Sequence, residues 1–155
     1  MTDAVPEAAA VASRALAAMV ESDLHDPVDG GFFRYATRRD WSIPHYERML
    51  TDNAGLIEVA LDAGDAATAL DAGRFLVDVL QQPSGGFAAA QDSESMIDGE
   101  RSEGGYYALD AEGRSRLEPP SLDDRIVNQS AVLSTMSDAS ASMDDWLDAH
   151  PHVAP

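Results

Sequence analysis

Cysteine and lysine are both absent from this chain of 155 residues, and all ten of its basic residues are arginine. Without cysteine, the chain forms no disulfide and offers no thiolate nucleophile. Long apolar runs are missing too, and none approaches the roughly 18 residues of a membrane-spanning helix. The N-terminus lacks the basic-then-apolar pattern of a secretory signal. We therefore expect a cytoplasmic protein that does not enter a membrane.

Positive charge is scarce, since the formal net charge is −18 and the sequence pI is about 4.2. Such an acidic surface either binds a cationic partner or belongs to a protein from a halophile. In a halophile's cytoplasm, salt near 1 M shortens the Debye length to about 3 Å, which screens the repulsion between the acidic residues. The acidic residues are spread along the chain rather than gathered in one tail, which favours the halophile. Because no cluster of cations exists to release counterions from phosphates, we expect no binding to nucleic acid.

Apolar residues recur at helical spacing in three segments, which predict helices over residues 5–22, about 43–63 and about 65–81. Ser42 is the expected N-cap of the second helix, with Pro44 tolerated in its first turn. An Asp-Ala-Gly-Asp turn separates the second helix from the third. A turn this short requires the two helices to lie antiparallel, so the sequence predicts a helical hairpin.

A Gly-Gly-aromatic pattern begins at Gly30, Gly85 and Gly104. Its recurrence indicates an α-helical repeat array in which loops reach equivalent places. The last two copies are expected to pair as a short β-hairpin across residues 92–103, a segment that is itself interpreted as a solvated acidic loop. Residues 122–136 predict only a weak helix.

His45 is the first candidate for chemistry, because a pKa near 6.5 suits proton transfer at neutral pH. Its alternative role is to help cap a helix. Asp52 lies two helical turns further on, about 11 Å away and too far for direct contact. Glu47 or Asp52 together with Asp92 could act as acid and base on a sugar. No His-x3-His motif occurs, so no metal site is expected.

Two amides offer a second kind of candidate. Asn53 lies on the apolar stripe of its helix and needs hydrogen-bond partners if it is buried. These partners are either a neighbouring loop or a polar ligand in a cavity. Gln91 follows a Gly-Gly-Phe turn and could reach the same cavity.

Residues 30–56, GGFFRYATRRDWSIPHYERMLTDNAGL, resemble the signature of the spermatogenesis-associated, thioredoxin-like family. The shared pattern is Gly-Gly-Phe-x-Arg-Tyr, then Trp-x-x-Pro-His-Tyr-Glu and Met-Leu, then Asp-Asn-Ala. Arg48 stands where the family usually has lysine. A later Gly-Gly-Phe-x-x-x-Gln-Asp segment is matched from Gly85 to Asp92.

The resemblance implies a fold. Members of this family carry a thioredoxin-like domain followed by a six-hairpin α/α toroid, similar to N-acylglucosamine 2-epimerases and several glycosidases. We therefore expect an all-α chain: a partial α/α toroid of about two helical hairpins with a short β-hairpin loop over residues 5–128. Residues 129–155 are expected to be a poorly structured or weakly helical tail. The thioredoxin-like domain is missing, and the family's Trp-Asn motif does not follow the Asp-Asp-Arg-Ile-Val segment.

The resemblance also implies a function, namely a toroid fragment that binds or acts on a sugar-like ligand without a cofactor. The expected catalytic residues are His45, Glu47, Asp52 and Asp92. The expected ligand-binding residues are Arg34, Tyr35, Trp41, Asn53 and Gln91. Two alternatives stay open. The chain is either a non-enzymatic module completed by a second chain, which carries the missing hairpins or a thioredoxin-like domain, or a non-functional gene remnant.

Overall fold

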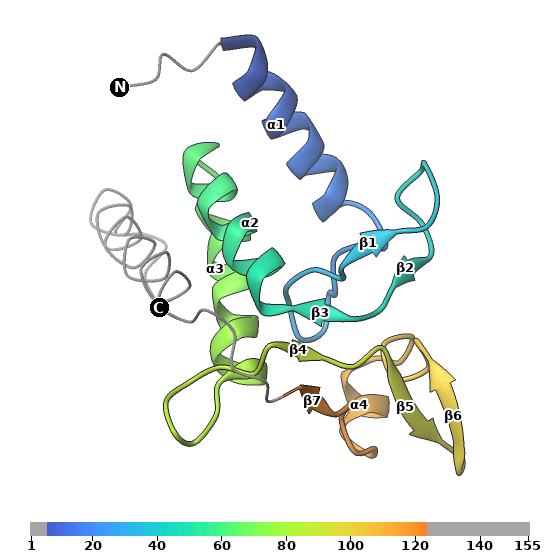
Figure 1. Ribbon diagram of the computed structural model, residues 1–155. Coiled ribbons are helices and arrows are strands. Elements are labelled where there is room, and N and C mark those ends of the chain that lie inside the picture. The colour runs from blue at the N-terminus through green and yellow to red at the C-terminus, as the bar shows by residue number, and fades with distance from the viewer. Residues whose placement is uncertain (1–5, 124–155) are drawn as a thin grey trace.

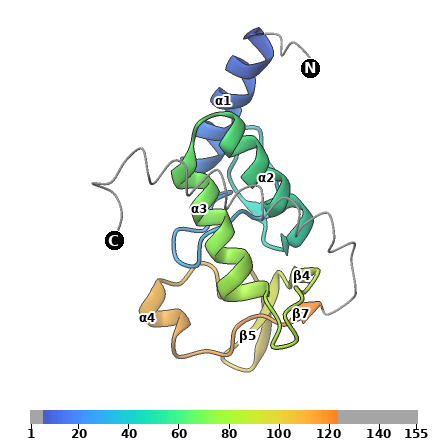
Figure 2. The same cartoon turned by 90° about the vertical axis from the view of Figure 1, so that its left-hand side faces the viewer.

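The computed structural model describes residues 6–123, which form a helical end and an end built from short strands (Figures 1 and 2). In chain order the elements are α1 (Pro6–Val20), β1 (Tyr35–Ala36), β2 (Pro44–His45), β3 (Arg48–Met49), α2 (Leu50–Asp62), α3 (Ala66–Phe75), the π-helical turn η1 (Leu76–Leu80), β4 (Ala90–Gln91), β5 (Glu94–Ile97), β6 (Glu100–Glu103), α4 (Ala111–Arg114) and β7 (Leu122–Asp123).

The expectation of an all-α partial toroid is wrong. Within the described residues the strands form three antiparallel sheets, ordered β1-β2, β3-β4-β7 and β5-β6, and only α2 and α3 make a helical hairpin. The fold is therefore mixed, with helices and strands sharing one small unit.

The second helix starts later than its sequence pattern predicts, and the backbone explains why. Trp41 and Ile43 have positive φ angles of 63° and 50°, which a right-handed helix cannot accommodate. The hydroxyl of Ser42 donates to Asp40 at 2.6 Å instead of capping a helix. The chain therefore turns back as a strand before α2 begins at Leu50.

Segments distant in sequence close the sheet beneath α2. Arg48 and Met49 of β3 pair with Gln91 and Ala90 of β4, and β4 pairs in turn with β7. The stretch that was expected to start a helix is therefore held in a ladder by partners more than forty residues away. Such pairing overrides local helical preference.

The acidic segment, expected as a solvated loop, is itself a hairpin. Strand β5 pairs with β6 around Asp98 and Gly99, whose φ angles of 51° and 85° suit a tight two-residue turn. The hairpin thus forms within residues 92–103 and not between the flanking Gly-Gly segments. It projects from the lower edge of the molecule in Figure 1.

The predicted antiparallel pair of helices is confirmed by α2 and α3, which lie side by side in Figure 2. Asp65 caps α3 by accepting from the amide of Thr68 at 3.1 Å. The main core forms between these helices, with Leu16 of α1 and the segment after η1. Its buried members are Leu16, Leu50, Ala54, Ile57, Ala60, Ala69, Ala72, Phe75, Leu76, Leu80, Phe87 and Ala88.

A second apolar cluster lies where the helical end meets the short strands. It contains Leu24, Phe33, Tyr106 and Tyr107. None of the helices in the described part of the chain is long and apolar enough to cross a membrane. The predicted weak helix over 122–136 and the tail from 129 fall almost entirely outside the described residues, so the domain boundary near 128 stays a prediction.

Candidate functional site

His45 lies between two carboxylates, one from the link between β2 and β3 and one from β6. Its Nδ1 is 2.9 Å from Oε1 of Glu103 on β6, and its Nε2 is 3.8 Å from Oε2 of Glu47. The imidazole and Glu47 are about one-quarter exposed, whereas Glu103 is half exposed. The contact with Glu103 spans 58 residues of sequence and attaches the β5–β6 hairpin to β2.

Two further predicted residues, Arg34 and Tyr35, contact Glu47 and His45, and the pKa of a third, Asp52, responds to the same charges. Arg34 donates from Nη1 to Oε2 of Glu47 at 2.6 Å, which orients that carboxylate. The ring of Tyr35 lies 5.2 Å from the imidazole, centroid to centroid, because the two residues are paired across β1 and β2. Burial raises the pKa of Asp52 above its ordinary value, Arg34 counters this rise, and Glu47 adds to it.

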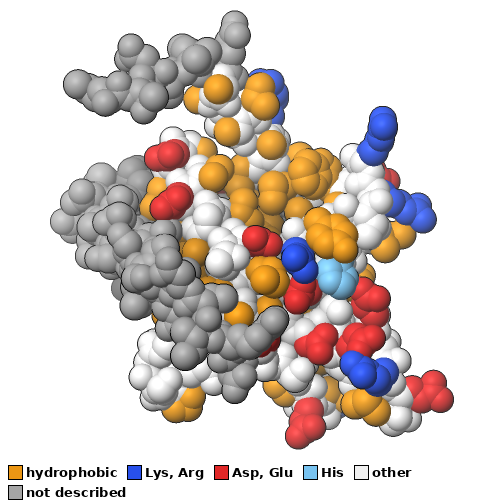
Figure 3. Space-filling view, in the orientation of Figure 1, with side chains coloured by type: hydrophobic (Ala, Val, Ile, Leu, Met, Phe, Trp, Pro, Cys, Tyr) orange, Lys and Arg blue, Asp and Glu red, His pale blue; other side chains and the backbone are white. Residues whose placement is uncertain are grey.

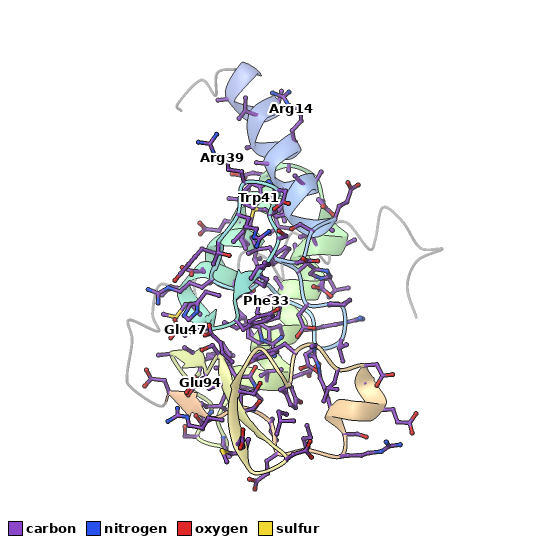
Figure 4. All side chains as sticks on the ribbon, turned by 90° about the vertical axis from the view of Figure 1, so that its right-hand side faces the viewer. Arg14, Phe33, Arg39, Trp41, Glu47 and Glu94 are labelled. Atoms are coloured by element: carbon purple, nitrogen blue, oxygen red, sulfur yellow. The ribbon has the colours of Figure 1, made fainter. Side chains whose placement is uncertain are left out.

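We call this group the His45 cluster and define it as Arg34, Tyr35, His45, Glu47 and Glu103. The space-filling view shows a histidine side chain with arginine and acidic side chains around it (Figure 3). In Figure 4, Glu47 and Glu94 are labelled on the same side of the molecule. Within residues 6–123, no three His, Asp or Glu side chains converge to hold a metal ion.

Asn53 and Gln91, predicted as ligand-binding residues, have their amides bonded within the protein. Asn53 is fully buried, accepts from the amide of Phe32 at 2.7 Å, and donates to the carbonyls of Phe32 and Met49. Gln91 is 2% exposed and accepts from Arg48 and from the hydroxyl of Tyr107. For Asn53 this geometry matches the alternative in which its amide holds a neighbouring loop, and Gln91 likewise bonds to side chains of the protein.

Asp92 and Trp41 lie at other points of the structure. Asp92 accepts from the amide of Glu94 at 3.0 Å and from the hydroxyl of Ser121 at 3.4 Å. Trp41 packs against the second apolar cluster. Among the described contacts, neither residue touches His45.

A buried ionic network was not anticipated from the sequence. Asp26 is fully buried and receives both Arg48, through Nη1 at 2.8 Å, and Arg114, through Nη1 at 2.7 Å and Nη2 at 2.9 Å. Asp29 accepts from the same two guanidinium groups at 3.3 and 2.8 Å. Arg48 also packs over the ring of Phe75, with Cζ 4.3 Å from the centroid. Two charges of each sign compensate one another in this network, as buried ions require.

Sequence reasoning missed both the buried role of Arg48 and the contact of Glu103 with His45, for different reasons. Arg48 carries a weak signal, because it directly precedes the apolar pair Met49 and Leu50 and a cation must be paired if it is buried. Glu103 carries none, since it is one of several acidic residues in a charged run. Only the folded hairpin distinguishes it from the others.

One further hollow adjoins this region. A cleft of about 290 Å³ lies beside the end of α1. Phe33, Tyr46 and Tyr107 line it together with Asp23 and His25. Tyr46 is the residue after His45, so the cleft and the His45 cluster adjoin where β2 ends.

The fold and the site define a small mixed α/β unit with a histidine–carboxylate cluster on its surface. No family model matches the chain. Spermatogenesis-associated protein 20 of Mus musculus is 35% identical over 118 residues, covering 70% of this chain and 15% of that protein. The human protein of the same name is 34% identical over 122 residues, with the same coverages. An uncharacterized protein of Caenorhabditis elegans is 26% identical over 136 residues, covering 81% of this chain and 18% of its own length.

The chain is thus a homologue of spermatogenesis-associated protein 20 over about 70% of its length. These matches support the family resemblance found in the sequence. The chain corresponds to about 15% of the length of the named relatives.

Proposed function

We propose that the chain binds a sugar-like, hydroxyl-bearing small molecule at the His45 cluster, where the imidazole exchanges a proton with a ligand hydroxyl. The observation that carries this proposal is the position of His45 between Glu103 and Glu47. A histidine held by a carboxylate on one nitrogen is the usual arrangement of an oriented acid–base group.

The proton assignment follows from the unequal distances. Glu103 lies close enough to accept a hydrogen bond from Nδ1–H, which leaves the lone pair of the neutral ring on Nε2. Glu47 is 3.8 Å from Nε2 and is already bonded by Arg34. Nε2 is therefore the atom that takes a proton from a ligand hydroxyl and later returns it.

The surroundings suit a polyol. Half of the surface of Tyr35 is exposed, and its ring offers an apolar face against which the C–H face of a sugar packs. Arg34 supplies N–H donors and Glu47 supplies carboxylate acceptors, so neighbouring hydroxyl groups find both kinds of partner. The proposal rests on these side chains, since a fold alone does not specify chemistry.

The test is a two-dimensional NMR titration of the chain with glucose, mannose and N-acetylglucosamine, with sugar conversion followed by proton NMR. We expect the largest shift changes at His45, Tyr35 and Glu47. His45→Asn should lower any conversion by about 10²-fold or more, the usual contribution of a general acid–base group. His25→Asn is the matched control, because His25 also contacts a carboxylate, that of Asp71 at 2.8 Å.

Three outcomes would count against the proposal. The first is the absence of shift changes with every sugar. The second is a set of changes confined to the cleft beside Tyr46, which would place the ligand elsewhere. The third is conversion by the His45→Asn variant at the rate of the unchanged protein, which would remove the proton-transfer role.

A further inference from the structure

The cleft beside the end of α1 has an aromatic floor and an acidic mouth. Of the side chains that line it, Phe33 and Tyr107 are buried, whereas Asp23 is exposed. Burial therefore separates an inner, aromatic end from an outer end that meets solvent. The half-buried Tyr46 and His25 complete the walls. In Figure 4, Phe33 is labelled below α1 and above the β5–β6 hairpin.

Contacts within the protein hold the three rings of the cleft in place. Phe33 packs edge to face with both tyrosines, at 5.1 Å between centroids, and the rings of Tyr46 and Tyr107 stack at 5.7 Å. The backbone of Gly104 lies directly against Tyr46, since a Cβ added to Gly104 would overlap that ring. The aromatic end is therefore preorganised, which lowers the cost of binding a ligand.

The aromatic end already attracts positive charge from inside the protein. Cζ of Arg48 lies 5.2 Å from the ring centroid of Tyr107, and Cζ of Arg114 lies 5.6 Å from it. A cation within about 6 Å of such a ring is attracted by its π electrons. Because Asp26 and Asp29 pair with both guanidinium groups, this network adds no net positive charge to the cleft.

Asp23 supplies an uncompensated charge at the mouth. Among the described hydrogen bonds and ion pairs, none involves the side chain of Asp23. His25 does not neutralise it, because Asp71 lies 2.8 Å from Nε2 and balances any charge on the imidazole. In the neutral ring, Nε2–H donates to Asp71 and Nδ1 keeps a lone pair that can accept a hydrogen bond.

We propose that this cleft binds a small organic cation, a primary alkylammonium. The ammonium group donates to the carboxylate of Asp23 and to Nδ1 of His25. Its carbon chain, whose first carbons share the positive charge, packs on the aromatic rings. The volume of about 290 Å³ is at the small end of the range for ligand pockets, so it suits a chain of a few carbons. A neutral ligand fits less well, because it leaves the charge of Asp23 unpaired.

The proposal does not depend on sugar binding at the His45 cluster, which is tested with different ligands. A free amine and a lysine side chain of another protein offer the same chemistry. We assign the cleft to the free amine, and the experiment separates the two sources.

The experiment is an NMR titration of the full chain with n-butylamine at about pH 7 in about 0.15 M KCl. At this salt concentration the Debye length of about 8 Å limits the diffuse attraction of cations by the acidic protein. We expect saturable shift changes at Asp23, His25 and Tyr46. n-Butanol has a hydroxyl group in place of the ammonium and should bind at least about tenfold more weakly, since hydrogen bonds to charged groups are the stronger ones.

Two pairs of variants test the two ends of the cleft. Asp23→Asn should weaken the binding of butylamine about tenfold. Glu21→Gln is its matched control, because Glu21 is also exposed and close in sequence but does not line the cleft, and it should bind like the unchanged chain. Tyr46→Leu should weaken binding about threefold or more, whereas Tyr46→Phe keeps the ring and should not.

Far-UV circular dichroism checks that each variant is folded, and the comparison of Asp23→Asn with Glu21→Gln decides alone if Tyr46→Leu unfolds. Equal affinities for butanol and butylamine would overturn the proposal, because the cleft would then select only apolar chains. So would equal binding by Asp23→Asn and Glu21→Gln, or the absence of saturable shift changes. Nα-acetyl-lysine amide presents the side chain as a protein would. Binding of this amide more tightly than butylamine would overturn the assignment to a free amine.

Discussion

At the scale of single residues, Arg48 illustrates how one side chain joins several segments. Its guanidinium donates to Asp26, to the carbonyl of Gly30 and to Gln91, and no part of the residue is exposed. A planar group with five N–H donors can satisfy these acceptors at once, whereas a lysine ammonium presents a single point charge. Arg48 is therefore a structural centre of the protein.

We expect Arg48→Lys to destabilise the protein by about 2–4 kcal/mol. The buried carbonyl of Gly30 would lose its side-chain donor, and Gln91 would keep only the hydroxyl of Tyr107. Each lost hydrogen bond to a buried acceptor costs roughly 1–3 kcal/mol. The measurement is the urea midpoint of unfolding. Arg116→Lys serves as control, since Arg116 is 70% exposed and its ion pair with Glu112 should contribute little. Equal midpoints for both variants would contradict the structural role of Arg48.

Sequence reasoning identified part of the candidate site and missed part. Arg34, Tyr35, His45 and Glu47 do come together, because a resemblance over a continuous segment names neighbours that a hairpin keeps close. Glu103 was missed because its contact arises from the docking of a distant hairpin. Periodicity and spacing carry no information on such docking.

At the scale of elements, the loop before β1 packs directly on the helical hairpin. Gly31 has a φ of 72°, and a Cβ added there would lie 2.6 Å from Cδ1 of Phe75 and 2.9 Å from Oδ1 of Asn53. Both neighbours are fully buried and cannot move aside. Gly64, between α2 and α3, has a similar φ of 75° but no atom within 4 Å of the same position.

Alanine variants of Gly31 and Gly64 separate the free-energy cost of backbone strain from the cost of close packing. Gly64→Ala should cost about 1–2 kcal/mol, the penalty of a left-handed conformation for a residue with a Cβ. Gly31→Ala should cost about 1–3 kcal/mol more, because it adds a clash in a packed core. Thermal unfolding of both variants measures the difference. If the two alanine variants unfold at the same temperature, the loop is not packed as tightly on α3 as the structure has it.

The three long helices α1, α2 and α3 could be predicted, whereas the short α4 and the two-residue strands could not, for a physical reason. The segments of α2 and α3 are long enough to display an apolar stripe, and their predicted ends differ from the structure mainly where Trp41 and Ile43 force a turn. Strands of two residues are too short to show alternation. Of these, β3, β4 and β7 form because segments distant in sequence pair, and β1 and β2 form around a turn with positive φ angles, so the all-α expectation failed at these positions.

At the scale of the whole molecule, charge repulsion opposes folding. The net charge of −18 places many carboxylates near one another in the compact state. Raising KCl from about 0.1 to 2 M shortens the Debye length from about 10 Å to below 3 Å. We expect the midpoint of thermal unfolding to rise over this range, with a single cooperative transition at high salt.

Circular dichroism melts in KCl and in choline chloride test this expectation. Because screening depends on ionic strength, both salts should raise the midpoint by similar amounts, whereas a specific effect of K⁺ would appear in KCl alone. A midpoint that does not change with salt would mean that repulsion is unimportant. No cooperative transition at any salt concentration would support the alternative of a non-functional remnant.

The buried network around Asp26 has a consequence for how the chain is synthesised. Of this network, Asp26 and Asp29 leave the ribosome first, Arg48 emerges 22 residues after Asp26, and Arg114 emerges 88 residues after it. Until then the nascent chain has two aspartates of the network for one guanidinium, so this junction cannot be buried without an uncompensated charge. Loss of the segment that carries α4 should therefore also unfold the turn that follows α1, although the two are far apart in sequence.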